Sequence, residues 1–181
     1  MAEPCVNGSM FIDIMTQPGL GALRGSTDFT LRDDALNAKN PFTPTKGDES
    51  LRQYGASLSG PIKKNASSFS LSINGATDYT STNLLASTPT GELAQAVRQP
   101  SDRFSFNARL DTAINKDHSA RISFARNTSG RRNLGVGGFS LPTMAYRQDS
   151  RDNTLRLSEN GPLGKRFFTE SRLQIRWADQ T

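Results

Sequence analysis

Apolar and polar residues alternate with a period of two through most of this chain. The segments that alternate are, in order, 23–32, 53–62, 69–79, 104–114, 120–124, 155–157 and 167–177. Because successive side chains of a β-strand point to opposite faces, this period predicts strands with one apolar and one polar face. The segment 90–99 alone has a composition typical of a helix, which Pro100 would end. The chain is therefore expected to be all-β, with about seven strands.

The connections between these segments alternate in length. Tight turns are expected at 60–65, 115–118 and 161–165, whereas long connections rich in glycine and proline are expected at 33–52, 80–102 and 127–151. Loops of that length are unusual in compact soluble domains. Short turns alternating with long loops are typical of outer-membrane barrels, whose turns face the periplasm and whose loops face outward. The order predicts an antiparallel up-and-down meander that forms part of a transmembrane β-barrel.

Strand length and aromatic placement favour the same architecture. The segments 69–79, 104–114 and 167–177 each have the roughly 9–11 residues that a tilted transmembrane strand needs. Aromatic residues lie at both ends of the predicted strands, as in the two aromatic girdles of a barrel: Phe69, Phe167 and Phe168 beside short turns, and Tyr54, Tyr79, Phe104 and Trp177 beside long connections. A soluble β-sandwich also shows alternation, and it would instead pair non-consecutive strands in two packed sheets.

The predicted strands separate two sets of side chains. The outward, lipid-facing set includes Phe104, Phe106, Leu110, Leu173, Ile175 and Trp177. The opposite set is expected to face the lumen and supplies candidate contacts to a plug or a ligand: Arg103, Asn107, Arg109, Asp111, Arg121, Arg156, Glu170, Arg172 and Arg176. The arginines either pair across strands and hold a plug, or form a positive wall for an anionic or polyhydroxylated ligand.

Composition excludes several other kinds of site. The chain has 181 residues, with 34% hydrophobic and 22% charged residues and a net charge of +5. Its basic residues are dispersed, which argues against binding to nucleic acid. Cys5 and His118 are the single cysteine and histidine, so no zinc cluster is expected, and His118 is expected to be a solvated turn residue. No set of acid, base and nucleophile is found, and we predict neither enzymatic activity nor a cofactor.

Several segments resemble one protein family in sequence and in order. They are 11–19, 34–42, 54–65, 104–111, 114–118 and 153–162, and they resemble the end of the plug and the first barrel strands of Oar-like TonB-dependent outer-membrane receptors. The chain departs from that family at Arg24-Gly25, where the family usually has His-Gly. It departs again at the start of the third strand, at 67–70, where an aromatic cluster is usual.

The resemblance implies a domain organisation and a function. Residues 1–22 would be the C-terminal remnant of a plug domain and 23–181 the first seven strands of a barrel that has about 22 strands in such receptors. Residues 1–20 lack the features of a signal peptide, and the chain is expected to be a fragment of a longer receptor. That receptor would lie in the bacterial outer membrane, contact its lipid, couple to the TonB complex through the missing plug region and take up a nutrient. A secreted or surface β-sheet adhesin or carbohydrate-binding module is the alternative.

Overall fold

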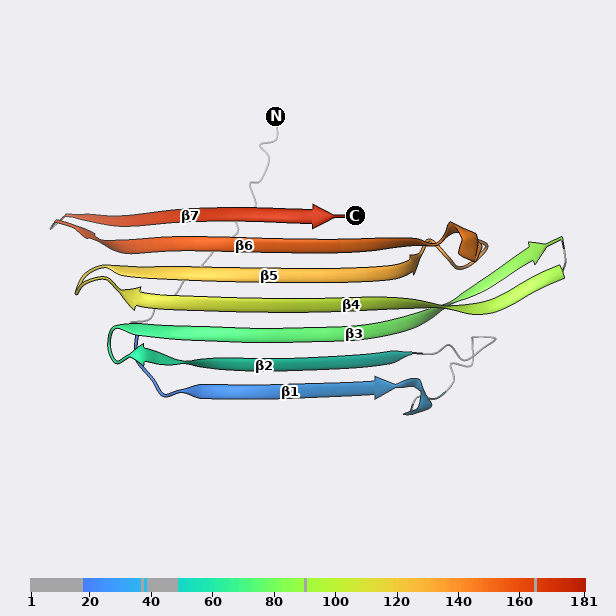
Figure 1. The fold of residues 1–181 in the computed structure, drawn as a ribbon, viewed down its shortest axis with the longest axis horizontal. Helices are drawn as coiled ribbons and strands as arrows, with labels where there is room; N and C mark the ends of the chain where they lie inside the picture. The colour runs from blue at the N-terminus through green and yellow to red at the C-terminus, as the bar shows by residue number, and fades with distance from the viewer. Residues whose placement is uncertain (1–17, 37, 39–48, 90, 165) are drawn as a thin grey trace, which may run out of the picture.

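The protein forms one antiparallel sheet of seven strands (Figure 1). A computed structural model describes all residues except 1–17, 37, 39–48, 90 and 165. The strands are β1 (Arg24–Asp33), β2 (Ser50–Lys63), β3 (Ser67–Thr88), β4 (Gly91–Ala113), β5 (Ser119–Leu134), β6 (Tyr146–Leu163) and β7 (Phe167–Gln180). Of the expected plug remnant at 1–22, only 18–22 belong to the described residues.

Each strand pairs with its neighbours in sequence. The strand order is β1-β2-β3-β4-β5-β6-β7, and every pair is antiparallel. The predicted meander is confirmed, and the non-consecutive pairing of a Greek-key sandwich is not found among the described strands. The sheet is open within the described part of the chain, with β1 and β7 at its edges.

The two ends of the sheet differ, as expected. The turns β2–β3, β4–β5 and β6–β7 lie together at the left of Figure 1, where Asn65 and Gly164 adopt positive φ angles of 58° and 70°. The end of β1, the β3–β4 hairpin and the β5–β6 connection lie at the right. The Gly19 carbonyl accepts a hydrogen bond of 3.1 Å from the Asn65 backbone N–H, so the chain enters β1 at the short-turn end.

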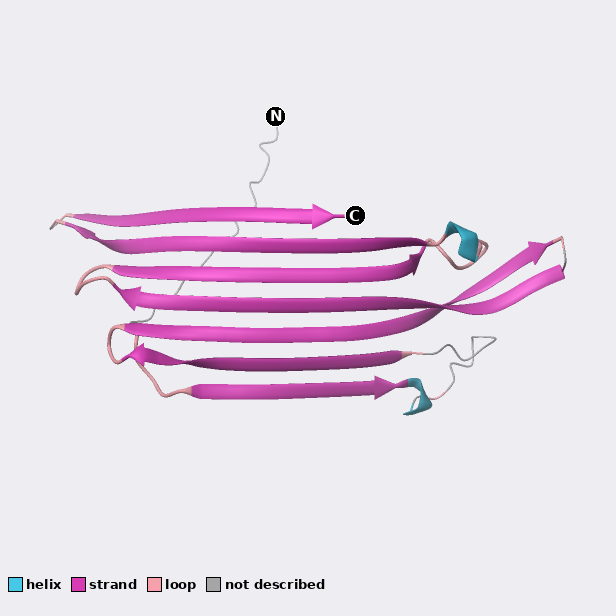
Figure 2. Cartoon of the chain, in the orientation of Figure 1, coloured by secondary structure: helices cyan, strands magenta, loops and turns pink. Residues whose placement is uncertain are grey.

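The predicted helix at 90–99 is wrong. Gly91 to Gln99 belong to β4, which pairs with β3 from Thr88↔Gly91 onward, and the long loop expected at 80–102 is a hairpin (Figure 2). The β5–β6 connection is also shorter than expected, because β5 reaches Leu134 and β6 begins at Tyr146. A ten-residue helix has marginal stability, whereas extending an existing ladder gives each backbone group a partner.

Two short 3-10 turns, η1 (Asp34–Leu36) and η2 (Pro142–Met144), are the helical elements among the described residues. No helix in this part of the chain is long and apolar enough to cross a membrane.

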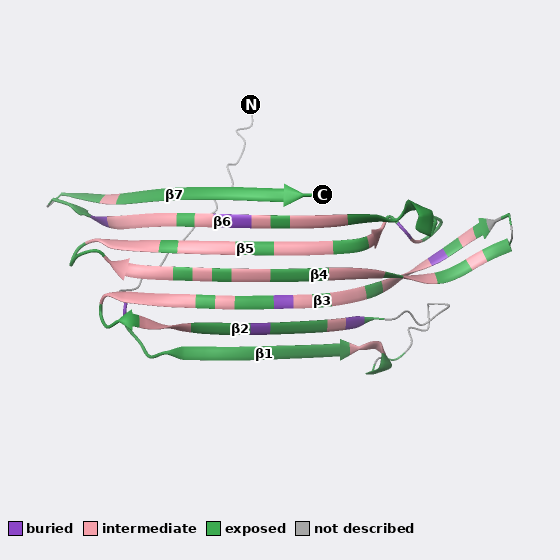
Figure 3. Cartoon of the chain, in the orientation of Figure 1, coloured by how far each residue is buried: buried purple, intermediate pink, exposed green. Residues whose placement is uncertain are grey.

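Backbone hydrogen bonds join the β3–β4 hairpin to the β5–β6 connection. The Leu85 N–H donates to the Gly138 carbonyl at 2.8 Å, and the Gly138 N–H donates to the Asn83 carbonyl at 2.9 Å. Leu84 and Val136 become buried there, and among the described residues they are the buried hydrophobic side chains. The sheet itself is a single layer whose large apolar residues are exposed or half-buried (Figure 3).

Candidate functional site

The strand register sorts the side chains onto two chemically different faces. Residues that are directly paired on neighbouring strands share a face of the sheet. One row of such pairs runs from β3 to β7 and contains Phe69, Leu110, Ile122, Leu157 and Leu173. The adjacent row contains Leu58, Leu71, Ala108, Phe124, Leu155 and Ile175. We call this side of the sheet the apolar face and the opposite side the polar face. Phe124 continues the aromatic packing of the apolar face, with ring centroids 6.3 Å from Phe106 and 6.2 Å from Trp177.

All nine side chains expected to face the lumen lie on the polar face. In β4, Asn107 pairs with Ser72 and Ala125, and Arg109 pairs with Ser70 and Ser123. The other seven follow by the same register, namely Arg103, Asp111, Arg121, Arg156, Glu170, Arg172 and Arg176. Serine and threonine fill most of the positions between them. Their role as plug or ligand contacts stays a prediction.

Asp111 is the centre of the tightest polar cluster. Its carboxylate accepts a hydrogen bond of 2.6 Å from Arg121 Nε and forms an ion pair of 3.1 Å with Arg109 Nε. The Asp111 and Arg121 side chains are only 16% and 17% exposed, so solvent screens their attraction less than that of a surface pair. One carboxylate thus balances two guanidinium groups from neighbouring strands.

Four other arginines of this face each contact one side chain among the described residues. Arg103 donates to Asp78 at 2.8 Å, Arg172 Nε to Glu170 at 2.7 Å, and Arg176 Nε to Asp152 at 2.6 Å. Arg156 Nε donates to the neutral amide oxygen of Gln174 at 2.9 Å. Asn107 makes a long hydrogen bond of 3.4 Å to Ser72 Oγ. Positive charge therefore exceeds negative charge around Asp111 and Arg156.

These residues line a shallow hollow of about 780 Å³ on the polar face. Its wall includes Arg109, Arg121, Arg156 and Arg172, separated by serines and Gln174. Guanidinium, hydroxyl and amide groups at such spacing bind carboxylates, phosphates or sugar hydroxyls. The described residues contain no group of three His, Cys, Asp or Glu side chains that could hold a metal ion.

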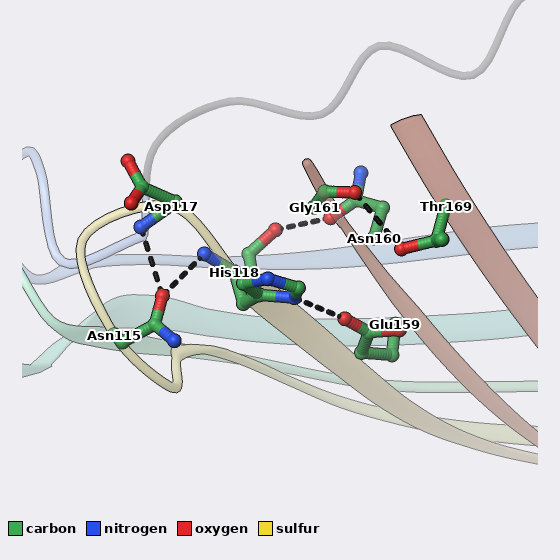
Figure 4. Close-up of polar contacts among 8 residues, drawn as sticks. Asn115, Asp117, His118, Glu159, Asn160, Gly161 and Thr169 are labelled. Carbon is green, nitrogen blue, oxygen red and sulfur yellow. Dashed lines mark hydrogen bonds and ion pairs between the residues drawn. The ribbon is translucent and has the colours of Figure 1, made fainter. Parts of the chain in front are cut away.

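His118 is less exposed than the sequence led us to expect. It lies at the end of the β4–β5 turn, its side chain is 27% exposed, and its Nδ1 is 2.6 Å from Glu159 Oε1 (Figure 4). The imidazole covers Gly161, where any larger residue would collide with it. Asn115 Oδ1 accepts hydrogen bonds from the backbone N–H groups of Asp117 and His118 and fixes the turn.

The Glu159 carboxylate raises the pKa of His118 above its usual value, mainly through their hydrogen bond. A charged residue at an apolar position of the alternation was the sequence signal for this pair, since Glu159 is paired with Ala120 on the apolar face. Because His118 and Glu159 are 41 positions apart in the sequence, the sequence alone did not reveal their contact.

Comparison with known proteins identifies no relative. No protein-family model matches the chain, and no curated protein or solved structure matches it at a significant level.

Proposed function

We propose that this chain forms the first seven strands of the barrel of a TonB-dependent outer-membrane receptor that takes up a nutrient. One observation carries the proposal: a single-layer meander presents a continuous apolar face that nothing in the described chain covers. Trp177, Leu173 and Phe167 on this face are 48%, 53% and 71% exposed. Monomeric soluble proteins rarely leave an apolar surface of that extent in water, whereas lipid would cover it.

The dimensions of the apolar face agree with a membrane. Along β4 and the residue that follows it, the apolar positions run from Phe104 to Ile114. These ten steps correspond to about 34 Å along the strand, or about 24 Å across a bilayer when the strand is tilted by about 45°. The outward apolar band of known barrels is about 25 Å tall.

The apolar band also runs obliquely across the strands. On this face the band ends at a charged residue on each edge strand, which is Asp33 on β1 and Asp179 on β7. The paired residues that start from Asp179 lead across the sheet to Phe29 on β1, which lies four residues before Asp33. The displacement is about 14 Å over six strand spacings of about 4.8 Å each. Such a slant is expected when tilted strands cross a flat membrane boundary.

In this proposal the polar face lines the interior, and the short turns face the periplasm. The arginine-lined hollow would contact either the plug or the nutrient as it passes. The docking of Gly19 on the β2–β3 turn supports an N-terminal plug, because the chain then reaches the barrel from the periplasmic end. The Oar-like resemblance supplies the coupling to TonB.

Cysteine labelling in intact cells tests the orientation. In a Cys5→Ser background of the full-length gene product, Ser140→Cys in the β5–β6 connection should react with a membrane-impermeant maleimide. Lys116→Cys in the β4–β5 turn should react only after the outer membrane is permeabilised. Equal labelling of both in intact cells would contradict the orientation.

The transport function needs a separate test. The protein should be recovered in the outer-membrane fraction, and deletion of its gene should abolish uptake of the same nutrient that is lost in a strain without TonB. Secretion into the medium, or uptake that is independent of TonB, would favour the adhesin or carbohydrate-binding alternative.

A further inference from the structure

Arginines on the apolar face gather at one end of the sheet. Those within the strands lie at or beyond the long-loop edge of the apolar band, at Arg52, Arg98, Arg126, Arg132, Arg147 and Arg151. The opposite edge carries the His118–Glu159 pair and no strand arginine on this face. The cationic residues of this face are therefore distributed asymmetrically between the two ends.

Of these six arginines, Arg147 alone forms an ion pair with a carboxylate among the residues that the structure describes. Arg147 pairs with Asp149, and the Arg98 guanidinium lies 3.2 Å from the centre of the Tyr79 ring. Arg126, Arg132 and Arg151 form no ion pair with any residue that the structure describes. This contrasts with the polar face, where most of the predicted arginines contact a carboxylate.

We call Arg126, Arg132, Arg147 and Arg151 the outer arginine cluster. They line a hollow of about 650 Å³ together with Tyr54 and Phe104 of the aromatic rim. Asp102, Asp149 and Asp179 also line it, and Asp149 already contacts Arg147. The three unpaired arginines thus outnumber the two remaining carboxylates, and the hollow retains a positive charge.

Arg126 lies directly between Phe106 on β4 and Asn153 on β6. Its aliphatic stem can cover apolar surface while the guanidinium turns toward the polar edge. Arg151 is paired with Thr128, two residues from Arg126, so the two side chains lie on neighbouring strands at diagonal positions. One phosphate between them could accept hydrogen bonds from both.

We propose that the outer arginine cluster binds the phosphate groups of anionic lipid headgroups in the membrane leaflet at the long-loop end. This inference rests on the proposed membrane location. Lipid is the ligand rather than a soluble anion because the cluster continues directly into the apolar band. A headgroup bound there would leave its acyl chains along Phe106 and Trp177. Basic hollows beside a membrane-spanning surface recognise headgroups in the same way.

The test compares two double variants of the full-length gene product. Arg126→Gln/Arg151→Gln removes two charges from the cluster. Arg32→Gln/Arg131→Gln removes two exposed charges from the polar face at the same end of the sheet. Each protein is reconstituted in phosphatidylcholine vesicles, and the relative association of spin-labelled phosphatidylglycerol and phosphatidylcholine is measured.

The unaltered protein and the polar-face variant should prefer phosphatidylglycerol. The cluster variant should lose about fivefold of that preference for each arginine removed, and the difference should shrink at high salt. An unchanged preference in the cluster variant would overturn the inference, as would displacement of the lipid by millimolar inorganic phosphate, which would indicate a site for the free ion. Failure of the unaltered protein to insert into vesicles would instead refute the proposed function.

Discussion

Arginine in place of Leu110 tests whether the apolar face contacts lipid. Leu110 is paired with Phe69 on one side and Ile122 on the other, so apolar side chains surround it on its face. It lies four residues from Ile114 and six from Phe104, or about 14 Å and 20 Å from the ends of the band. An arginine side chain at this position cannot reach either end.

The expected cost is about 2–4 kcal/mol, the value for arginine at the midplane of a barrel. With a factor of ten for each 1.4 kcal/mol, the folded population relative to the unfolded one falls roughly 30-fold to several-hundred-fold. Asn107→Arg is the matched control, because Asn107 faces the other side and, within the described part of the chain, its side chain makes a single long hydrogen bond, to Ser72. Loss of this hydrogen bond should lower the free energy of unfolding by at most about 1 kcal/mol.

Leu173→Arg separates lipid from an ordinary protein core. Leu173 lies in the same row as Leu110 but is 53% exposed, so in water arginine would be tolerated there. In a membrane it should cost nearly as much as Leu110→Arg. Urea unfolding of the full-length protein in vesicles, together with its level in the outer membrane, measures all three variants. Equal effects of Leu110→Arg and Asn107→Arg, or a neutral Leu173→Arg, would refute the lipid-facing assignment.

Three further predictions concern single contacts. Asp111→Asn should destabilise the protein by about 1–2 kcal/mol in denaturant unfolding, because it removes the negative charge that Arg109 and Arg121 share, whereas Glu170→Gln at an exposed pair should change stability little. Because the pKa of His118 is raised in the folded state, its pair with Glu159 should stabilise the protein fully below about pH 6.5 and stop doing so as the pH rises through the raised value. His118→Gln should weaken the pH dependence of the thermal unfolding midpoint over this range. A pH profile of the midpoint identical to that of the unaltered protein would contradict the role of the pair. Gly19→Ala should expose the Asn65 amide to hydrogen exchange more than Gly21→Ala does, since both have positive φ but only at Gly19 would a Cβ lie 2.5 Å from backbone atoms of the β2–β3 turn. Equal exchange in the two variants would show that the Gly19 contact does not form.

The sequence determined the two faces of the sheet and the order of its strands. Alternation is a local property, because each Cβ points away from that of its neighbour whatever the partner strand is. Leu110 and Arg109 therefore had to lie on opposite faces once the segment was a strand. Tight turns at three connections then required antiparallel neighbours there, and the alternation of short turns with long connections predicted the meander that the structure has.

Only the tertiary structure decided which residues meet across the strands. Sliding one strand by two residues keeps every side chain on its face but changes all its partners, so alternation cannot fix the register. The sharing of Asp111 by Arg109 and Arg121, and the contact of His118 with Glu159, depend on that register. The extension of β3 and β4 through 80–99 also depended on it. Backbone pairing with a strand already in place outweighed the weak helical preference of ten residues, and no property of that segment alone could reveal its partner.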